Sequence, residues 1–408
     1  MSGIAENMRR AEPPLAGAVG PIVATWFIQV VMALGMLAVP TLAPEIAAEI
    51  GVEATLVGGF ATLLWLAAIA SSLVAGPLIT QWGPLRMGQV CLVLYASGLA
   101  LAAHGSLALL ALSAIGIGFG CGPETPSSSA LLARVAPTRW RNLVFSAKQT
   151  GMQAGGMIAG FMFPALALAL GWRHVMLVAA LAALVAAILV EPLRRRYDHL
   201  ARETSDIVQL GFGAALGVVW RSHALRRLTF TGFAFCAMQI CLSTFLVTHG
   251  VVTLGYGLAL AGSMLALAQA GGLIGRILWG VLAGGHIATS TMMLTLGLAM
   301  TATSVAIGMA RADWDVSSIL MLSFIFGLTA SGWNGVMLAE MTRHAPAIAL
   351  GPIMGAMMAF GYLGLVVGPI VFAVAAAFLG LSGGFLAVAI LSLAGALAMS
   401  GLNSRAAV

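Results

Sequence analysis

The sequence predicts an all-α membrane protein whose twelve transmembrane helices form two pseudo-symmetric six-helix bundles. Three observations lead to this fold class: the composition, the spacing of the apolar stretches, and a similarity between the two parts of the chain. Of the 408 residues, 61% are hydrophobic and 8% are charged, whereas roughly 25% of the residues of a soluble domain are charged. With a mean hydropathy of +1.03, the chain belongs in a lipid bilayer.

The apolar stretches are spaced as twelve spans, each close to the roughly 20 residues that a membrane-crossing helix requires. The first stretch is too long for the core of a signal peptide, so we expect it to be retained as a helix. We expect the spans near residues 18–41, 55–79, 86–104, 107–133, 142–170, 174–191, 226–248, 257–283, 288–310, 317–341, 349–379 and 383–402.

The basic residues predict the orientation of these helices. Of the 19 basic residues, Lys148 and Arg276 fall inside spans. If the N-terminus is cytoplasmic, Arg173 and Arg311 fall outside and the remaining fifteen fall on the cytoplasmic side, as the excess of positive charge in cytoplasmic loops requires. We therefore expect a multi-pass protein of the cell (inner) membrane with both termini in the cytoplasm. Because the basic residues are distributed among the loops, they do not indicate a nucleic-acid interface.

The longest polar interruption, from Glu191 to Arg227, divides the spans six and six. We expect an N-terminal six-helix bundle at 1–191, a cytoplasmic linker at 192–225 and a C-terminal six-helix bundle at 226–408. The linker begins EPLRRRYDHLARETSD and continues GFGAALGVVWRSHALRRL. Its second part is typical of a basic amphipathic helix that lies along the cytoplasmic face, which is compatible with a simple connecting role.

The two parts of the chain resemble each other at matched positions. Residues separated by about 204 to 210 positions repeat the same local sequence or the same residue type. The matches are Arg134-Val135-Ala136-Pro137 with Arg343-His344-Ala345-Pro346, Gly76 with Gly280, and Gln29 with Gln239. A duplicated six-helix unit explains them, and such repeats place the substrate between the halves near the bilayer midplane.

The loop after the second span carries the sequence Gly76-Pro77-Leu78-Ile79-Thr80-Gln81-Trp82-Gly83-Pro84-Leu85-Arg86. It lies where the major facilitator superfamily of secondary transporters has its signature G-x-L-a-D-r-x-G-r-r, and the chain resembles that superfamily over nearly its whole length. Thr80 and Gln81 stand at the acidic and basic positions of the signature, and Gly284 replaces the acidic residue in the second half. The charge-mediated latch attributed to this motif is therefore not expected here.

The eighth span contains Gly275-Arg276-Ile277-Leu278-Trp279-Gly280. This segment resembles the part of monocarboxylate transporters and of the oxalate/formate group in which an arginine precedes a glycine by four residues. The resemblance implies that Arg276 binds the substrate carboxylate, which a guanidinium can hold by two parallel hydrogen bonds. The alternatives are a structural ion pair or extension of the side chain to the membrane interface. The first-span lysine of mammalian monocarboxylate carriers has no counterpart between Trp26 and Pro40.

Drug/proton antiporters of the superfamily are a less close match. They carry an arginine in the fourth span, where this chain is apolar near Leu112. Their glycine-proline signature in the fifth span is also incomplete, because TGMQAGGMIAGFMFP has the glycines without the G-P step. Efflux of amphipathic compounds or drugs, driven by protons, is therefore the alternative function rather than the first.

Two further charged residues lie inside neighbouring spans. Lys148, in the fifth span, would add positive potential for an anionic substrate, and the alternatives are a pair with Glu124 or extension of the side chain to the membrane interface. Glu124 follows Pro123 in the fourth span, about 15 Å from the cytoplasmic end at 1.5 Å per residue, and Lys148 lies at a similar depth. A buried carboxylate is suited to carry a proton, so Glu124 is a candidate for proton coupling, with a fixed ion pair as the alternative.

Several uncharged polar residues within the spans are candidate substrate ligands, with hydrogen bonding between helices as the alternative for each. They are Gln29, Gln239, Gln149, Gln153, Trp333 and Asn334. At the cytoplasmic end of the tenth span, Glu340 and Arg343 are spaced i,i+3 and predict a gate or structural ion pair.

The sequence thus predicts a secondary active transporter that moves a small organic anion, a carboxylate, by alternating access and together with protons. The expected partners are this anion, protons and the lipid bilayer, and we expect a monomer without cofactor or metal. No nucleophile–base pair, metal-ligand spacing or phosphate-binding loop indicates an enzyme.

Overall fold

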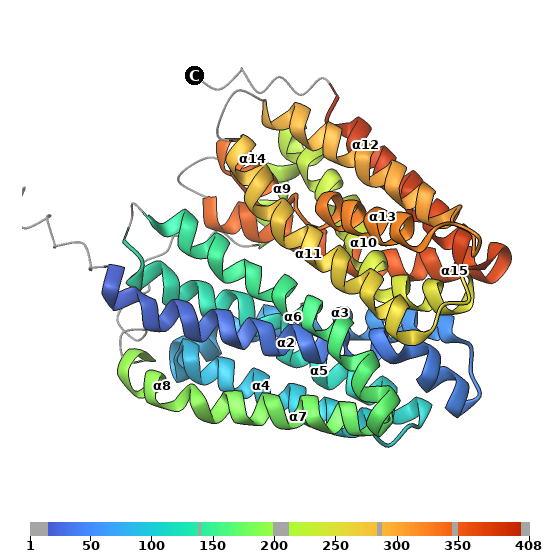
Figure 1. The fold of residues 1–408 in the computed structure, drawn as a ribbon. Helices are drawn as coiled ribbons and strands as arrows, with labels where there is room; N and C mark the ends of the chain where they lie inside the picture. Colours follow the sequence, from blue (N-terminus) through green and yellow to red (C-terminus); the bar gives the residue numbers. More distant parts are fainter. Residues whose placement is uncertain (1–14, 138–139, 199–211, 284–287, 345–349, 401–408) are drawn as a thin grey trace, which may run out of the picture.

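The computed structural model describes residues 15–137, 140–198, 212–283, 288–344 and 350–400. Within these ranges the secondary structure is helical, with no strand. The helices are α2 (Leu15–Ile50), η1 (Ala54–Leu56), α3 (Val57–Trp82), α4 (Pro84–Ala102), α5 (Leu107–Val135), α6 (Arg141–Leu170), α7 (Trp172–Leu189), α8 (Glu191–Tyr197), α9 (Phe212–Arg221), α10 (His223–Val252), α11 (Leu258–Ala283), α12 (Thr289–Gly308), α13 (Val316–Ala330), α14 (Asn334–His344) and α15 (Leu350–Ala398). Figure 1 shows them as a bundle of long helices.

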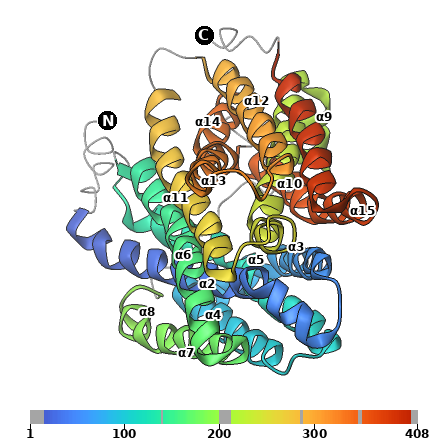
Figure 2. The ribbon, with the colours of Figure 1, turned by 45° about the vertical axis from the view of Figure 1, so that its right-hand side comes forward.

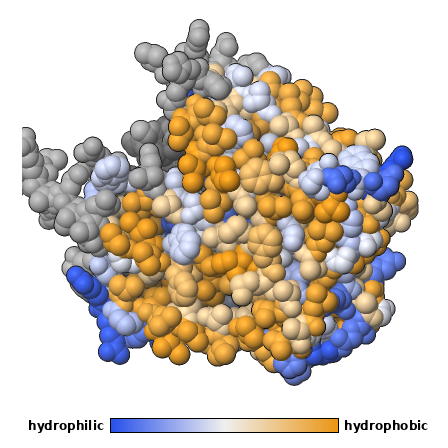
Figure 3. All heavy atoms as spheres, viewed as in Figure 1, coloured by the Kyte–Doolittle hydropathy of each residue, from blue (hydrophilic) through white to orange (hydrophobic). Residues whose placement is uncertain are grey.

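Eleven helical segments among the described residues are long and apolar enough to cross a membrane. Apolar side chains also cover the face of the molecule in Figure 3, while hydrophilic side chains gather at its margins. Leu73, Ile188 and Phe378 are examples of large apolar side chains that are mostly exposed, as lipid contact requires. The protein is therefore a multi-pass membrane protein, as the composition predicts.

The eleventh segment, α15, accounts for both of the last two predicted spans. Its 49 residues would extend over about 74 Å if straight, more than twice the hydrocarbon thickness of about 30 Å. The helix instead reverses at Gly380, whose φ of 69° and ψ of 176° are not helical. The two arms return to the same level of α10, because Gly364 lies against Phe233 and Gly395 lies against Ala234. With the two arms of α15 counted separately, the described residues thus contain twelve helical segments that are candidates to cross the membrane.

The tenth predicted span is broken in the structure. The sequence predicts one helix over 317–341, whereas α13 ends at Ala330 and α14 begins at Asn334. Ser331–Trp333 form a turn between them, in which Trp333 donates from its indole nitrogen to the Ala330 carbonyl at 3.0 Å. The break lies in the middle of an apolar run, where transporters commonly interrupt a helix beside a ligand site.

The helices pack in two groups. Helices α2–α7 pack mainly on one another, and helices α10–α15 do the same. The N-terminal group is drawn in blue to green and the C-terminal group in yellow to red, and the two lie side by side in Figures 1 and 2. They meet mainly through three helix pairs: α6 with α11, α3 with α15, and α2 with α10.

The α6–α11 contact involves close backbone approach at small residues. Gly160 on α6 lies against Gly262 on α11, and a β-carbon at Gly160 would lie 2.6 Å from the backbone nitrogen of Ala266. Pro164 also lies against Gly262.

These residues lie toward the end of the molecule that carries the α6–α7 and α10–α11 connections. We call it the hairpin end, and the end that carries α8 and α9 the linker end.

At the linker end, the start of α4 is held by the residue that follows α8. The Asp198 carboxylate accepts hydrogen bonds from the backbone N–H groups of Leu85, at 2.8 Å, and Arg86, at 2.9 Å. Gly83, with φ of 95°, allows the close approach, because a β-carbon there would collide with Asp198. Thr80, predicted in a loop, lies in the last turn of α3. The connection that follows α3 at Gly83 is thus fixed by a carboxylate from the linker.

Only the first part of the predicted amphipathic helix forms α9, which ends at Arg221, because Ser222 caps a new helix and the basic residues Arg226 and Arg227 belong to α10. Ala215 and Val219 are buried where α9 packs on α15 and α10. Trp220 makes an edge-to-face contact with Phe360, with ring centroids 5.4 Å apart. Trp220 is nevertheless 46% exposed, and Arg221 is exposed as well.

Candidate functional site

The polar side chains of the membrane-spanning region converge where α6 faces α11. Gln149 and Gln153 are one turn apart on α6, and Gly272 and Arg276 are one turn apart on α11. Residues four apart lie on one face of a helix, so each helix presents one polar face to the other. Helices α2 and α10, and the turn between α13 and α14, contribute further polar groups near this contact.

Arg276 reaches across this contact toward the N-terminal group. Its Nη1 donates to the backbone carbonyl of Gln149 at 3.5 Å, the long limit of a hydrogen bond. Its Nε is buried without a hydrogen-bond partner. Among the described residues, no carboxylate lies within salt-bridge distance of this guanidinium. Arg276 therefore faces the contact between the two helix groups with most of its donors available.

Gln29 and Gln149 form a hydrogen bond between α2 and α6. The Gln29 Nε2 donates to Gln149 Oε1 at 3.0 Å, while Gln29 Oε1 is buried without a partner. One turn away on α2, the indole nitrogen of Trp26 donates to the Thr150 hydroxyl at 3.0 Å. The two candidates thus lie together, and Gln149 connects Gln29 to Arg276.

Gln239 and Asn334 join α10 to the broken span. Asn334 Nδ2 donates to Gln239 Oε1 at 3.3 Å and to the Ser331 carbonyl at 3.4 Å. Trp333 is almost fully buried and packs edge-to-face on Phe235, with ring centroids 5.6 Å apart. Asn334 and Gln239 therefore pair with each other, and Trp333 fills the interior of the C-terminal group.

Lys148 and Glu124 form a buried ion pair between α6 and α5. The ammonium lies 3.0 Å from Glu124 Oε1 and donates to Oε2 at 3.2 Å, and Thr125 donates to Oε2 at 3.0 Å. The two side chains are 1% and 5% exposed. Lys148 and Gln149 are adjacent on α6, yet one turns toward α5 and the other toward α2.

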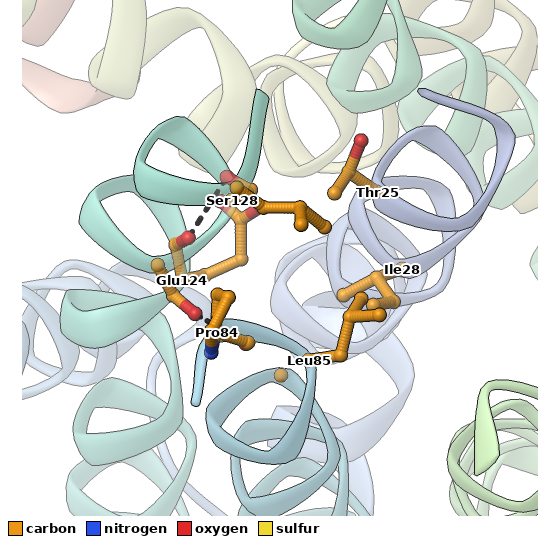
Figure 4. A pocket seen from close by; sticks show the side chains of 9 residues that line it. Thr25, Ile28, Pro84, Leu85, Glu124 and Ser128 are labelled. Atoms are coloured by element: carbon orange, nitrogen blue, oxygen red, sulfur yellow. Dashed lines mark hydrogen bonds between the residues drawn. The ribbon is translucent and has the colours of Figure 1, made fainter. Parts of the chain in front are cut away.

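A small pocket lies between α2, α4 and α5, and Glu124 is one of the residues that line it. Figure 4 shows Thr25, Leu85, Glu124 and Ser128 among the residues that line it. Ser128 donates to the Glu124 carbonyl at 2.9 Å, and Ser127 donates to the Pro84 carbonyl. These serines fix the segment after Pro123 and Pro126, two prolines that cannot donate backbone hydrogen bonds within α5.

Glu340 lies on α14 at the linker end. Its carboxylate is fully buried, with His344 Nε2 at 3.1 Å and Arg343 Nη1 at 3.7 Å. Arg343 is 57% exposed, so its long contact with Glu340 is weak. The predicted i,i+3 pair is present, and His344 is a closer partner that the sequence analysis did not include.

Two polar residues at the α6–α11 contact, Gln269 and Ser331, are absent from the sequence predictions. Gln269 lies seven residues before Arg276 on the same face of α11, donates to the Ser243 hydroxyl at 3.2 Å and packs against Gly156 of α6. Ser331 lies in the break of the tenth span and has a buried hydroxyl without a partner. The i,i+7 spacing from Arg276 could have identified Gln269, whereas Ser331 carries no comparable signal.

Comparison with known proteins places the chain in a family. Residues 25–369 match the family model of the Major Facilitator Superfamily. No curated protein sequence gives a significant match. The comparisons do not support the closer resemblance to monocarboxylate and oxalate/formate transporters.

Several solved transporter structures share the fold at low sequence identity. A bacterial homologue of the human lysosomal transporter Spinster, inward-facing and occupied, aligns with a TM-score of 0.72 at 14% identity over 93% of this chain and 95% of its own. The nucleoside transporter NupG aligns with a TM-score of 0.75 at 12% identity, covering 93% and 98%. A POT family transporter in complex with 5-aminolevulinic acid gives 0.70 at 14% identity, covering 93% and 94%.

The family model covers most of the chain, and the fold extends over nearly the full length of each of these transporters. NupG is a nucleoside transporter, whereas the POT family structure is a complex with 5-aminolevulinic acid. The similarity therefore shows the fold and does not identify a substrate for this chain. The chain therefore belongs to the Major Facilitator Superfamily and is a membrane transporter rather than an enzyme.

Proposed function

We propose that this transporter moves a small organic anion, a carboxylate, together with protons, and that Arg276 binds the anion. The observation that carries the proposal is the guanidinium at the α6–α11 contact, which has a single long bond to a backbone carbonyl. A guanidinium stays charged, and placing it at membrane depth costs several kcal/mol unless it is paired or hydrated. A substrate carboxylate supplies the missing partner.

The same proposal includes the division of the chain into two pseudo-symmetric six-helix bundles at 1–191 and 226–408, joined by the linker at 192–225. The grouping of α2–α7 and of α10–α15 supports it. In alternating access, the two bundles rock about the site between them. Arg276 belongs to one bundle and its carbonyl partner Gln149 to the other, so a bound anion would contact both.

Proton coupling is assigned in this proposal to Glu124, with Lys148 as its counter-ion. Protonation of the carboxylate would release the Lys148 ammonium, which could then add its charge to the anion site one residue from Gln149. Gln29, Gln239 and Asn334 would complete the polar lining, with Trp333 as a packing partner behind it. Glu340 and Arg343 would act in closure of the linker end.

Replacing Arg276 by lysine tests the binding role. The Arg276→Lys variant keeps the positive charge but loses the two-pronged hydrogen bonds, so we expect it to fold normally and to lose at least 90% of anion uptake, about a tenfold effect that matches one charge-assisted hydrogen bond. Uptake of radiolabelled carboxylates into proteoliposomes, with and without an imposed pH gradient, measures it.

The matched control is Arg226→Lys, because Arg226 is exposed at the linker end. It should transport like the unsubstituted protein. Unchanged uptake kinetics in Arg276→Lys would refute the binding role, and uptake indifferent to the pH gradient in the unsubstituted protein would refute proton coupling.

Efflux of amphipathic compounds is the second candidate function. It is favoured by an apolar pocket of about 190 Å³ between α2, η1, α3 and α5, lined by residues such as Val39, Phe60 and Leu110. This pocket lies within the N-terminal group, toward the hairpin end, and not beside Arg276. Dye extrusion by cells that express the protein, without carboxylate uptake, would support this function over the first.

A further inference from the structure

We propose that the transported anion is a hydroxylated carboxylate, and that its hydroxyl groups bind to Gln153, Ser331 and Gln29 while its carboxylate binds to Arg276. This inference rests on the proposed function and adds the substrate class. It is drawn from buried polar atoms that have no hydrogen-bond partner among the described residues.

Three such atoms lie at the contact between the two helix groups. They are Gln29 Oε1, Gln153 Oε1 and the Ser331 hydroxyl, and each residue is only 1% exposed. Leaving a buried polar group without a hydrogen bond is unfavourable, because the group has lost its hydrogen bonds to water and gained none in return. Three in one region, together with the Nε of Arg276, indicate a place that is built to bind a polar molecule.

The contacts around Gly272 show that these groups are neighbours. A β-carbon at Gly272 would lie 2.7 Å from Ser331 Cβ and 3.3 Å from Gln153 Cγ. Arg276 is the next turn of the same helix, and it bonds to Gln149, one turn from Gln153. Gln149 in turn accepts from Gln29 at 3.0 Å. A single small molecule could therefore contact all of them.

The chemistry of the groups specifies the ligand. A guanidinium offers donors alone, so it selects a carboxylate or another anion. An amide offers an acceptor and donors, and a serine hydroxyl offers both, whichever way each amide is turned. A hydroxyl on the ligand can donate to one and accept from another. An unsubstituted fatty acid of the same length would leave these amides and the serine hydroxyl unpaired.

Three-carbon acids separate hydroxylation from size. Glycerate, lactate and propionate share a chain length and a carboxylate, and carry two, one and no hydroxyl groups. We expect the purified protein to bind glycerate most tightly and propionate at least tenfold more weakly, because a site that hydrogen-bonds a hydroxyl discriminates strongly against the analogue that lacks it. Gluconate and hexanoate form the corresponding six-carbon pair for a larger site. Isothermal titration measures both pairs.

Substitution of Gln153 tests the assignment of the hydroxyl contact. Gln153→Leu should weaken glycerate binding three- to tenfold, the value of one neutral hydrogen bond, and leave propionate binding unchanged. Ser331→Ala, a smaller change, should have the same selectivity. Gln81→Leu is the matched control, because Gln81 is exposed at the end of α3.

The outcomes distinguish this inference from the proposed function. If hydroxylated and unsubstituted acids bind equally, or if Gln153→Leu weakens both in parallel while the protein melts normally, the substrate class is wrong and anion transport stands. If no carboxylate of either length binds, the proposed function itself fails.

Discussion

Arg276 and Lys148 are both cations at membrane depth, yet their surroundings differ. Lys148 is paired with Glu124 at 3.0 Å, and both side chains are buried, whereas the contact of Arg276 is a backbone carbonyl at 3.5 Å. Removing one partner of a buried pair leaves an uncompensated charge. Substitution of Lys148 should therefore lower mainly the stability of the protein, whereas substitution of Arg276 should lower mainly the transport rate.

The Glu124–Lys148 pair predicts a non-additive effect on stability. Lys148→Met alone would leave the Glu124 carboxylate buried without its counter-ion, at a cost of about 3–5 kcal/mol. Adding Glu124→Gln to Lys148→Met should recover most of that loss. Thermal unfolding of the purified protein measures both variants.

If Glu124 also carries the proton, Glu124→Gln should transport the anion without stimulation by a pH gradient. Equal melting of the single and double variants would show that the pair contributes little to stability. A double variant that melts normally and keeps its response to the gradient would remove Glu124 from proton coupling.

Single charges were predictable from the sequence because they are rare within apolar spans. Glu124 and Lys148 stand at similar depth on consecutive spans, and the structure brings them together. Amides and hydroxyls are common in membrane helices, so only the i,i+7 spacing from Arg276 distinguished Gln269, and no sequence pattern distinguished Ser331. Ser331 acquires its position from the break between α13 and α14, which an unbroken apolar run does not reveal.

Among the helices, α6 and α11 make the contact on which movement of the two groups would depend. Gly262 lies against Gly160 and Pro164, without room for a side chain. Gly262→Leu should separate the helices at the hairpin end and open that end to water. A cysteine at Ala266 should then react faster with a water-soluble maleimide than it does in the unsubstituted background.

Gly280→Leu is the control in the same helix, because a β-carbon there would meet no atom within 4 Å. It should leave the labelling rate unchanged. If Gly262→Leu labels at the control rate and the protein is folded, the α6–α11 contact does not hold the hairpin end closed.

The helix pattern was largely predictable, and its exceptions have physical causes. Twelve spans follow from composition and length alone. The sequence also indicated that the loop after the second span lacks its acidic residue at Thr80, but not that Asp198, more than a hundred residues later, caps α4. A hydrogen bond between residues so distant depends on the packing of α8 against α4, which local patterns do not encode.

For the whole molecule, the arginine distribution predicts that the linker end faces the cytoplasm. A cysteine at Asp313, in the exposed loop before α13, should react with an impermeant maleimide in intact cells. A cysteine at Arg195, which is 76% exposed at the linker end, should react only after the cells are permeabilised. The opposite labelling pattern would show that the predicted orientation is wrong. Labelling of the unsubstituted protein measures the background from its four cysteines.

The reversal at Gly380 has a consequence for how the chain enters the membrane. Leu350–Ala398 contains no charged residue and no polar loop between its arms, so nothing separates two successive insertion events. The two arms should partition into the bilayer as one hairpin. Gly380 adopts a φ that other residues disfavour, and its non-helical conformation divides this one long segment into two arms. The reversal at Gly380 therefore directs the second arm of α15 back toward the side of the bilayer from which the first arm begins.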